Sequence, residues 1–332
     1  MKAKEARLFF IFLLAIVAAY LAVPTVTVTE LVYPIRKDSV FLRNQQVLLE
    51  SKNTSDEEAV KKFLYNPGQL GLAYRDITTA ASDGDSLRWW VINDSVFTTG
   101  YHLLVIPDMN ESRLDYIEFA DEATGRGLTV SVADMRGQGS SGGKKYIPGR
   151  EAVSDISLII DSLKSFFSLE EIAVFGTGTG AAIAIQAAQR DKRIGAVVLE
   201  NPFISINRFL NEYTRKKYRW ASFLFQKRMK KEYFRETGIH PDSLDIEKMI
   251  SQYEQPVMFI SRISEKNLDY KTEQRLFRVS PSKGKRWMAL LTFDETPDRE
   301  AALKKYFDRL ATFVNVSLPK PVKTKPRYKR VA

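Results

Sequence analysis

The sequence predicts an α/β fold with a mostly parallel central sheet and helices on both faces. Between residues 73 and 316, short runs of strand-forming residues alternate with amphipathic segments of helical length. This alternation is typical of strands joined by crossover helices, which cover a parallel sheet on both sides. The chain has 332 residues and is 44% hydrophobic, which suits one large core with accessory segments.

The chain begins with a predicted membrane-targeting segment, residues 1–24. Basic residues precede an uninterrupted apolar run from Leu8 to Val23, which Pro24 closes. A positive flank before an apolar run places the N-terminus in the cytoplasm, so we expect the rest of the chain on the exported, extracytoplasmic side. The small-residue site Val17–Ala19 would cut the run short, which favours an uncleaved signal anchor. Cleavage of a signal peptide and secretion is the alternative.

Residues 25–72 are predicted to form a membrane-proximal stalk or flap. The segment "TVTVTELVYPI" is β-prone, and "SDEEAVKKFLYN" has the cap and the acidic first turn of a helix. No residue in this segment suggests chemistry.

The elements of the core follow from residue 73 onwards. Asp83 and Gly84 form a tight-turn dipeptide between two predicted strands. Amphipathic helices are predicted where apolar residues recur at helical spacing, and glycine ends the first of them. In chain order the elements are the strand pair "YRDITTAASDGDSLRWWVIND", the strand "YHLLVIPD", the helix "ESRLDYIEFADEATGRG", the strand "LTVSVADMRG", the helix "EAVSDISLIIDSLKSFF", the strand "EIAVFG", an alanine-rich helix and the strand "IGAVVLENP".

Five motifs in this order resemble the α/β-hydrolase fold, in particular its serine-aminopeptidase-like and acylglycerol-lipase-like branches. They are "DGDSLRWW", "ADMRGQGSSGG", "EAVSDISLIIDSL", "FGTGTGAAIA" and "QPVMFISR". Each motif is weak alone, but the ordered set is specific. The resemblance covers residues 73–202 and 256–316, on either side of an insertion at 203–255 that corresponds to the family's cap. Ser140 and Ser141 resemble a serine of the arginine-glycine loop that is structural in the family.

The resemblance implies a nucleophile position at Gly178, which has no side chain. Thr177 and Thr179 flank this apex of the strand-to-helix turn and are expected to point away from the cleft. The family's oxyanion loop usually follows the third strand with His-Gly, whereas this chain has Pro107 and Asp108 there. Proline donates no N–H and a carboxylate repels a developing oxyanion, so both residues oppose catalysis.

The acid and base positions also depart from the family pattern. The loop after "PVMFI" offers only Glu265, an imperfect acid, and the segment after the last strand offers Asp294 and Glu295 but no histidine. Carboxylates with ordinary pKa values are poor general bases for a hydroxyl. The only histidines, His102 in the third strand and His240 in the insertion, are expected to be structural or solvated.

These departures predict a pseudoenzyme, a membrane-anchored protein of hydrolase fold that acts in binding, scaffolding or assembly with a protein partner. The alternative is an active hydrolase of ester or peptide bonds that uses Thr177 or Thr179 as its nucleophile. Glu265 or Asp294 would then assist that hydroxyl.

The turn itself is a candidate anion site, because the helix that follows aims free N–H groups at the old active site. A carboxylate or phosphate would be held by Gly176, Thr177, Gly178, Thr179 and Gly180. Alternatively, the glycines only permit tight packing, and side chains of the cap fill the cleft.

Charge and composition limit the partners. The net charge of +10 favours anionic partners, and the absence of cysteine excludes disulfides, thiolate metal sites and a cysteine nucleophile. We expect no metal and no cofactor. From residue 208 to 235, ten Lys or Arg stand against two Glu among many aromatics, and the tail at 317–332 is basic and proline-rich. Anionic lipid or an acidic polymer fits both segments, whereas the export signal argues against nucleic acid. An amphipathic cap with merely solvated charges, and a plain solvated terminus, are the alternatives.

Overall fold

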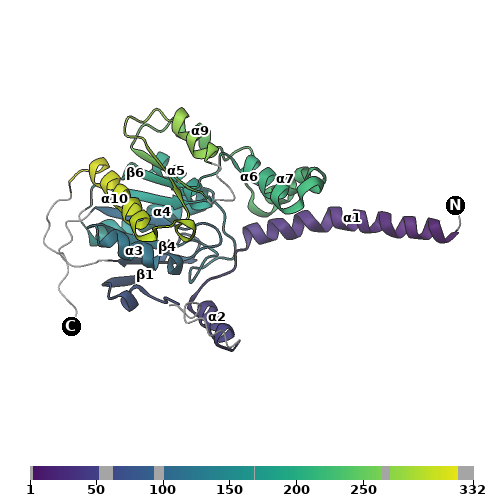
Figure 1. Ribbon diagram of the computed structural model, residues 1–332, viewed down its shortest axis with the longest axis horizontal. Helices are drawn as coiled ribbons and strands as arrows, with labels where there is room; N and C mark the ends of the chain where they lie inside the picture. Colours follow the sequence, from purple (N-terminus) through teal and green to yellow (C-terminus); the bar gives the residue numbers. More distant parts are fainter. Residues whose placement is uncertain (1–2, 52–62, 93–100, 168, 264–269, 321–332) are drawn as a thin grey trace. The chain divides into compact units, whose positions relative to one another are not determined.

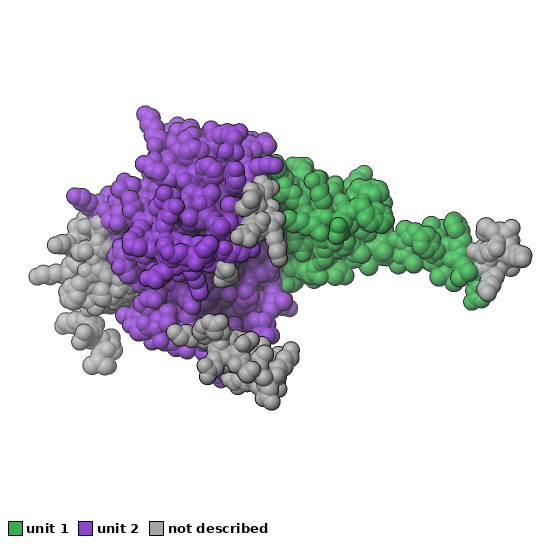
Figure 2. Space-filling view, in the orientation of Figure 1, with its two compact units in different colours: residues 1–33, 203–245 green, residues 34–202, 246–332 purple. Residues whose placement is uncertain are grey.

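The structure is a computed structural model that describes residues 3–51, 63–92, 101–167, 169–263 and 270–320. The chain divides into two compact units, which are coloured separately in Figure 2. One unit contains residues 1–33 and 203–245, and the other contains residues 34–202 and 246–332. Residues 246–255, which the sequence reading placed in the cap, therefore group with the sheet.

The second unit is built on an eight-stranded sheet with the order β1-β2-β4-β3-β5-β6-β7-β8. β2 pairs antiparallel with β1 and β4, and the other pairings are parallel, which confirms the predicted mostly parallel sheet. The strands are β1 Tyr74–Ala80, β2 Ser86–Ile92, β3 His102–Ile106, β4 Thr129–Asp134, β5 Ile172–Thr177, β6 Ile194–Glu200, β7 Val257–Ile263 and β8 Arg286–Leu291.

Helices cover both faces of this sheet (Figure 1). On one face, α3 and α10 pack onto a buried apolar cluster that includes Val105, Phe175 and Val198 from three neighbouring strands. α4 and α5 pack against each other and cover the other face. The helices are α2 Ser39–Ser51, α3 Ile117–Thr124, α4 Arg150–Phe166, α5 Thr179–Arg190, α8 Ile246–Ile250, α9 Lys271–Val279 and α10 Arg299–Ser317, with short 3-10 turns η1 Pro67–Leu70, η2 Arg113–Tyr116 and η4 Phe293–Glu295.

The first unit joins the N-terminal helix to the cap. It contains α1 Ala3–Val32, α6 Ile206–Tyr218, the 3-10 turn η3 Arg219–Ala221 and α7 Ser222–Thr237. The stretch Arg7–Val32 of α1 is long and apolar enough to cross a membrane, as either an anchor or a signal sequence.

The β-prone segment after Pro24 is helical, so the sequence-based expectation of a strand there was wrong. α1 continues through Pro24 to Val32. Thr25, Thr27 and Thr29 each donate their hydroxyl to the carbonyl four residues earlier, which is the helical arrangement that threonine can adopt. Packing of the helix overrides the β propensity of the sequence. The predicted helix "SDEEAVKKFLYN" lies mostly outside the described residues, and the helix seen nearby, α2, begins where Asp38 accepts the Phe41 N–H.

Candidate functional site

The turn from β5 into α5 keeps the tight geometry of a nucleophile elbow. Gly178 stands at its apex with φ 51° and ψ −114°, a conformation that side chains disfavour. A Cβ at Gly176 would overlap the backbone of α5 at Ala181, and one at Gly180 would overlap the carbonyl of Ile106 in β3. The two outer glycines therefore let the helix approach the sheet closely.

The carboxyl group of Asp108 occupies the space beside the apex. A Cβ built on Gly178 would overlap this carboxyl group, with Asp108 Oδ1 only 2.6 Å away. In this conformation, a side chain at position 178 and the carboxylate of Asp108 exclude each other.

Asp108 also takes the backbone donors of the elbow. Its Oδ1 accepts the N–H of Thr179 at 2.8 Å and the N–H of Met109 at 2.8 Å, together with the Thr179 hydroxyl at 2.5 Å. One N–H belongs to the residue after the apex and the other to the loop after β3, which are the two positions that form the oxyanion hole of a nucleophile elbow. The positive end of α5 and these two donors therefore already hold a carboxylate.

The loop that carries Asp108 is fixed on several sides. The backbone N–H of Asp108 donates to Glu111 Oε2 at 3.0 Å, and the backbone carbonyl of Asp108 accepts a hydrogen bond from Gln138 Nε2 at 2.5 Å. The preceding carbonyl, of Pro107, accepts the Tyr146 hydroxyl at 3.2 Å. These bonds place the Asp108 side chain over the elbow rather than towards solvent.

Thr177 belongs to a buried polar cluster beneath the elbow. Its hydroxyl lies 2.7 Å from the Tyr116 hydroxyl and donates to Glu111 Oε2 at 3.2 Å. Tyr116 also donates to the same carboxylate at 2.5 Å. Burial, with the negative charge of Glu111, raises the pKa of Tyr116 well above its ordinary value, so this phenol stays protonated as a donor.

Glu200, at the end of β6, forms a second buried cluster. It accepts the Tyr306 hydroxyl at 2.5 Å, and Arg262 Nη1 lies 3.6 Å from its other oxygen. Burial raises the pKa of Glu200, and the Arg262 charge opposes that rise. Sequence reasoning missed both Glu111 and Glu200. The only signal for Glu200 was its place at the carboxyl end of a strand, and Glu111 gave none.

The structure does not describe the side chains at the predicted acid and base positions. Glu265 lies outside the described residues, and Asp294 falls in η4 after β8, with its side chain also outside them. His102 is buried at the start of β3, at the opposite edge of the sheet from the elbow, where its Nε2 lies 2.8 Å from Ser131 Oγ. Burial lowers the pKa of His102 to about 3. His240 is exposed in the other unit and accepts the Asp242 N–H.

The arginine-glycine loop is structural, as the resemblance implies. The buried Asp134 accepts the N–H groups of Arg113 and Ser140, at 2.8 and 2.9 Å. The Ser141 hydroxyl donates to the carbonyl of Asp134 and accepts the Arg88 N–H. Burial raises the pKa of Asp134, and the neighbouring Arg113 opposes the rise.

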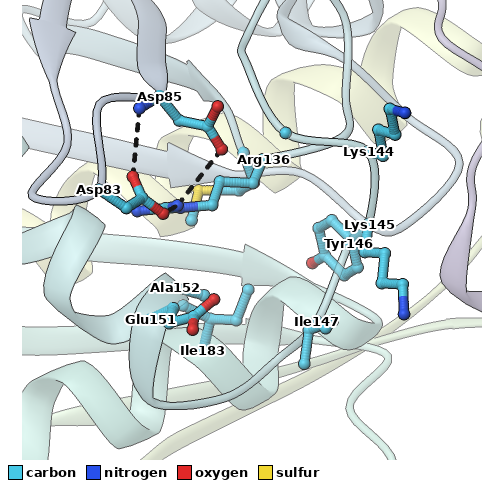
Figure 3. Close-up of a pocket in the computed structure, with 12 residues that line it drawn as sticks. Asp83, Asp85, Arg136, Lys144, Lys145, Tyr146, Ile147, Glu151, Ala152 and Ile183 are labelled. Carbon is cyan, nitrogen blue, oxygen red and sulfur yellow. Dashed lines mark hydrogen bonds and ion pairs between the residues drawn. The ribbon is translucent and has the colours of Figure 1, made fainter. Parts of the chain in front are cut away.

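A pocket of about 310 Å³ adjoins this loop (Figure 3). Tyr146 lines it and also reaches the elbow, since its hydroxyl lies 3.3 Å from Thr179 Oγ1. Arg136, on the opposite wall, is held by Asp83 and Asp155. No cluster of three or more His, Cys, Asp or Glu suited to a metal ion occurs among the described residues.

Comparison with known proteins identifies the family of the chain and solved structures of similar fold. The family model described as serine aminopeptidase S33 matches residues 101–285. An uncharacterized protein of Mycobacterium tuberculosis is 32% identical over 135 residues, which cover 40% of this chain and only 47% of that protein. The esterase Pf2001 of Pyrococcus furiosus has a TM-score of 0.60 at 17% identity, over 76% of this chain and 96% of its own. The α/β hydrolase GrgF of Penicillium sp. sh18 has a TM-score of 0.56 at 18% identity, over 74% of this chain and 99% of its own. These two structures share the fold.

Proposed function

Because the chain belongs to the serine aminopeptidase S33 family of α/β hydrolases, we propose that it is a member whose catalytic centre is closed by its own Asp108. It acts as a non-catalytic binding or assembly protein held at a membrane. The observation that carries this proposal is the Asp108 carboxylate on the two backbone donors of the elbow.

The electrostatics of the elbow support the loss of acyl transfer. A tetrahedral oxyanion about 4 Å from the Asp108 carboxylate would be repelled by roughly 4 kcal/mol at an effective dielectric constant of about 20. That repulsion alone corresponds to about a thousandfold in rate. Gly178 supplies no nucleophile, and the chain has no histidine after its last strand.

Attachment to the membrane through α1 completes the proposal. The apolar stretch Arg7–Val32 and the basic residues before it support an uncleaved anchor, with the rest of the chain on the exported side. A protein without turnover acts through what it binds, so we propose a protein partner at the same membrane.

One observation favours a second function, an active hydrolase with Thr179 as nucleophile. Its hydroxyl donates to the Asp108 carboxylate at 2.5 Å, which is the contact that a general base would make. Three features weigh against it. Thr179 is only 4% exposed, the same carboxylate fills the oxyanion hole, and a carboxylate is a weak base for a hydroxyl. Thr177, the other candidate nucleophile, is 9% exposed and engaged by Tyr116 and Glu111.

Turnover of small esters and aminoacyl substrates by the full chain tests the two functions. We expect no hydrolysis above that of buffer, and no change in the variants Thr177→Ala and Thr179→Ala. Hydrolysis that is lost in Thr179→Ala and kept in Thr179→Ser would establish the enzyme and overturn the proposal. Crosslinking in intact membranes, followed by identification of the proteins joined to the chain, tests the assembly role.

A further inference from the structure

The helices of the cap pack on the end of the membrane helix within the first unit (Figures 1 and 2). The Tyr218 hydroxyl, at the end of α6, bonds the Thr27 hydroxyl of α1. Near the end of α7, Glu236 accepts the Tyr33 hydroxyl at 3.3 Å. The residues of α1 that are buried are Pro24, Thr27, Val28, Leu31 and Val32.

These two contacts fix the direction of the cap along α1. The turn between α6 and α7 lies at the level of Thr27, whereas the end of α7 lies near Tyr33, farther from the apolar run. A helix rises about 1.5 Å per residue, so Thr27 lies only about 6 Å from Val23, where the apolar run ends. The turn between α6 and α7 is therefore held close to the place where α1 leaves the membrane.

Large apolar side chains project from this turn, which we call the interface tip, residues 219–224. Trp220 is 83% exposed, Phe223 is 67% exposed and Leu224 is 44% exposed. Removing such a side chain from water is favourable by roughly 1.5–3 kcal/mol. The side chains of the tip do not gain this free energy while they are exposed to water. Neighbouring side chains of comparable size, Phe225 and Met229, are buried. Phe234, near the end of α7, is 49% exposed, so within residues 203–245 the exposure is greatest at Trp220 and Phe223 of the tip.

Unpaired cations surround the interface tip. Arg215 and Lys216, in the last turn of α6, and Arg219 in the tip are exposed, and within the described part of the chain they form no ion pair. Lys217, beside them, pairs with Glu30 of α1. Exposed aromatic rings next to these cations are typical of side chains at the boundary between acyl chains and anionic headgroups. Tryptophan is enriched at that boundary, and attraction to an anionic membrane surface contributes about 1 kcal/mol per Lys or Arg.

We propose that the interface tip inserts into the boundary of the membrane that α1 spans, with Trp220 and Phe223 at the level of the upper acyl chains. Arg215, Lys216 and Arg219 contact anionic lipid phosphates. This inference rests on α1 remaining as the uncleaved anchor proposed above. The anchor supplies the effective concentration, since the tip is tethered next to the bilayer. An acidic polymer would bind the cations but would leave the rings in water, so the rings favour lipid.

Fluorescence quenching in vesicles tests the inference on the full chain. The protein is reconstituted into phosphatidylcholine and phosphatidylglycerol vesicles, with or without lipids brominated in the upper acyl chains. Trp89 and Trp90 are buried in the sheet. We therefore expect most of the quenched emission to come from Trp220 and to disappear in Trp220→Phe. The matched variant Trp287→Phe should keep the quenching, because Trp287 lies in β8 of the other unit.

Three further measurements separate the outcomes. Replacing Arg215, Lys216 and Arg219 with glutamine should weaken the quenching in vesicles that contain phosphatidylglycerol more than in pure phosphatidylcholine. Equal quenching in wild type and Trp220→Phe would overturn the inference. So would a response of Trp220 to dextran sulfate in detergent without a response to brominated lipid, which would instead indicate an acidic macromolecule. Mass spectrometry of the N-terminal peptide keeps the two proposals apart: an intact N-terminus without quenching sinks the tip alone, whereas a new N-terminus near Tyr20 sinks the anchor and the tip with it.

Discussion

Removal of the Asp108 carboxylate should convert the elbow into a site for external anions. In Asp108→Ala, the N–H groups of Thr179 and Met109 lose an acceptor at 2.8 Å, and the Thr179 hydroxyl loses one at 2.5 Å. Hydrogen bonds to a charged group contribute about 1.5–3 kcal/mol each. The three bonds share one oxygen, and water can replace part of them, so we expect a loss of about 3 kcal/mol. At about 2–4 °C per kcal/mol for a unit of this size, the melting temperature should fall by roughly 6–12 °C.

Acetate should restore much of that stability, because it supplies the carboxylate that the substitution removes. A ligand at a hundredfold excess over its Kd adds about 2.7 kcal/mol to the folded state. The assay is thermal unfolding of the full chain in detergent, with acetate titrated against chloride at constant ionic strength. The wild type should not respond, because Asp108 already fills the site. Glu151→Ala, which removes an exposed carboxylate on α4, is the matched control and should respond no more than the wild type.

Two results would refute this reasoning. One is an Asp108→Ala protein as stable as the wild type, which would mean that the carboxylate contributes nothing at the elbow. The other is equal stabilisation of wild type and variant by acetate, which would mean that the anion binds elsewhere. The sequence-based anion site at Gly176 to Gly180 stays a prediction for external ligands, and this titration tests it with the internal carboxylate removed.

Three further predictions concern Gly178, His102 and the N-terminal helix α1. Gly178→Ser should remain unreactive towards a fluorophosphonate and should lose about 1–3 kcal/mol of stability, because a side chain there is strained and overlaps Asp108; probe labelling of this variant would contradict it. His102 has a folded pKa of about 3 against an unfolded value near 6.5. Between these two values only the unfolded chain binds the proton, so the free energy of unfolding decreases as the pH is lowered below 6.5. Urea unfolding at pH 7 and pH 5 should show wild type losing about 2 kcal/mol more than His102→Gln, at about 1.4 kcal/mol per pH unit; equal losses would mean that this imidazole titrates normally. The mature protein should stay with membranes through alkaline carbonate washing, and its release with a new N-terminus near Tyr20 would show that α1 is cleaved.

The order of the core strands and helices could be predicted from the sequence because hydrophobic periodicity and glycine-marked turns report local structure directly. Propensity failed after Pro24, where threonines that favour strands are helical because the buried face of α1 packs on the cap. There, tertiary packing outweighed a local preference of a few tenths of a kcal/mol per residue.

At the elbow, too, the sequence predicted the individual positions but not how their side chains pack together. Sequence comparison placed Gly178 at the nucleophile position and Asp108 in the oxyanion loop, but treated them as two separate departures from the family pattern. The structure shows that they are one feature, since the glycine leaves the space that the carboxylate fills. The partners Glu111 and Glu200 could not be found, because no motif marks them and because the contacts of Glu111 with Thr177 and of Glu200 with Tyr306 join segments distant along the chain.

Activity-based labelling of the unmodified protein tests the central proposal most directly. Full-length chain in membranes is treated with a fluorophosphonate beside an active serine hydrolase, and its intact mass is then measured. The closed elbow predicts no mass increase while the control enzyme is fully labelled. A stoichiometric adduct that maps to Thr177, Thr179, Ser140 or Ser141, and that disappears when that residue is changed to alanine, would contradict the proposal and make the protein an enzyme.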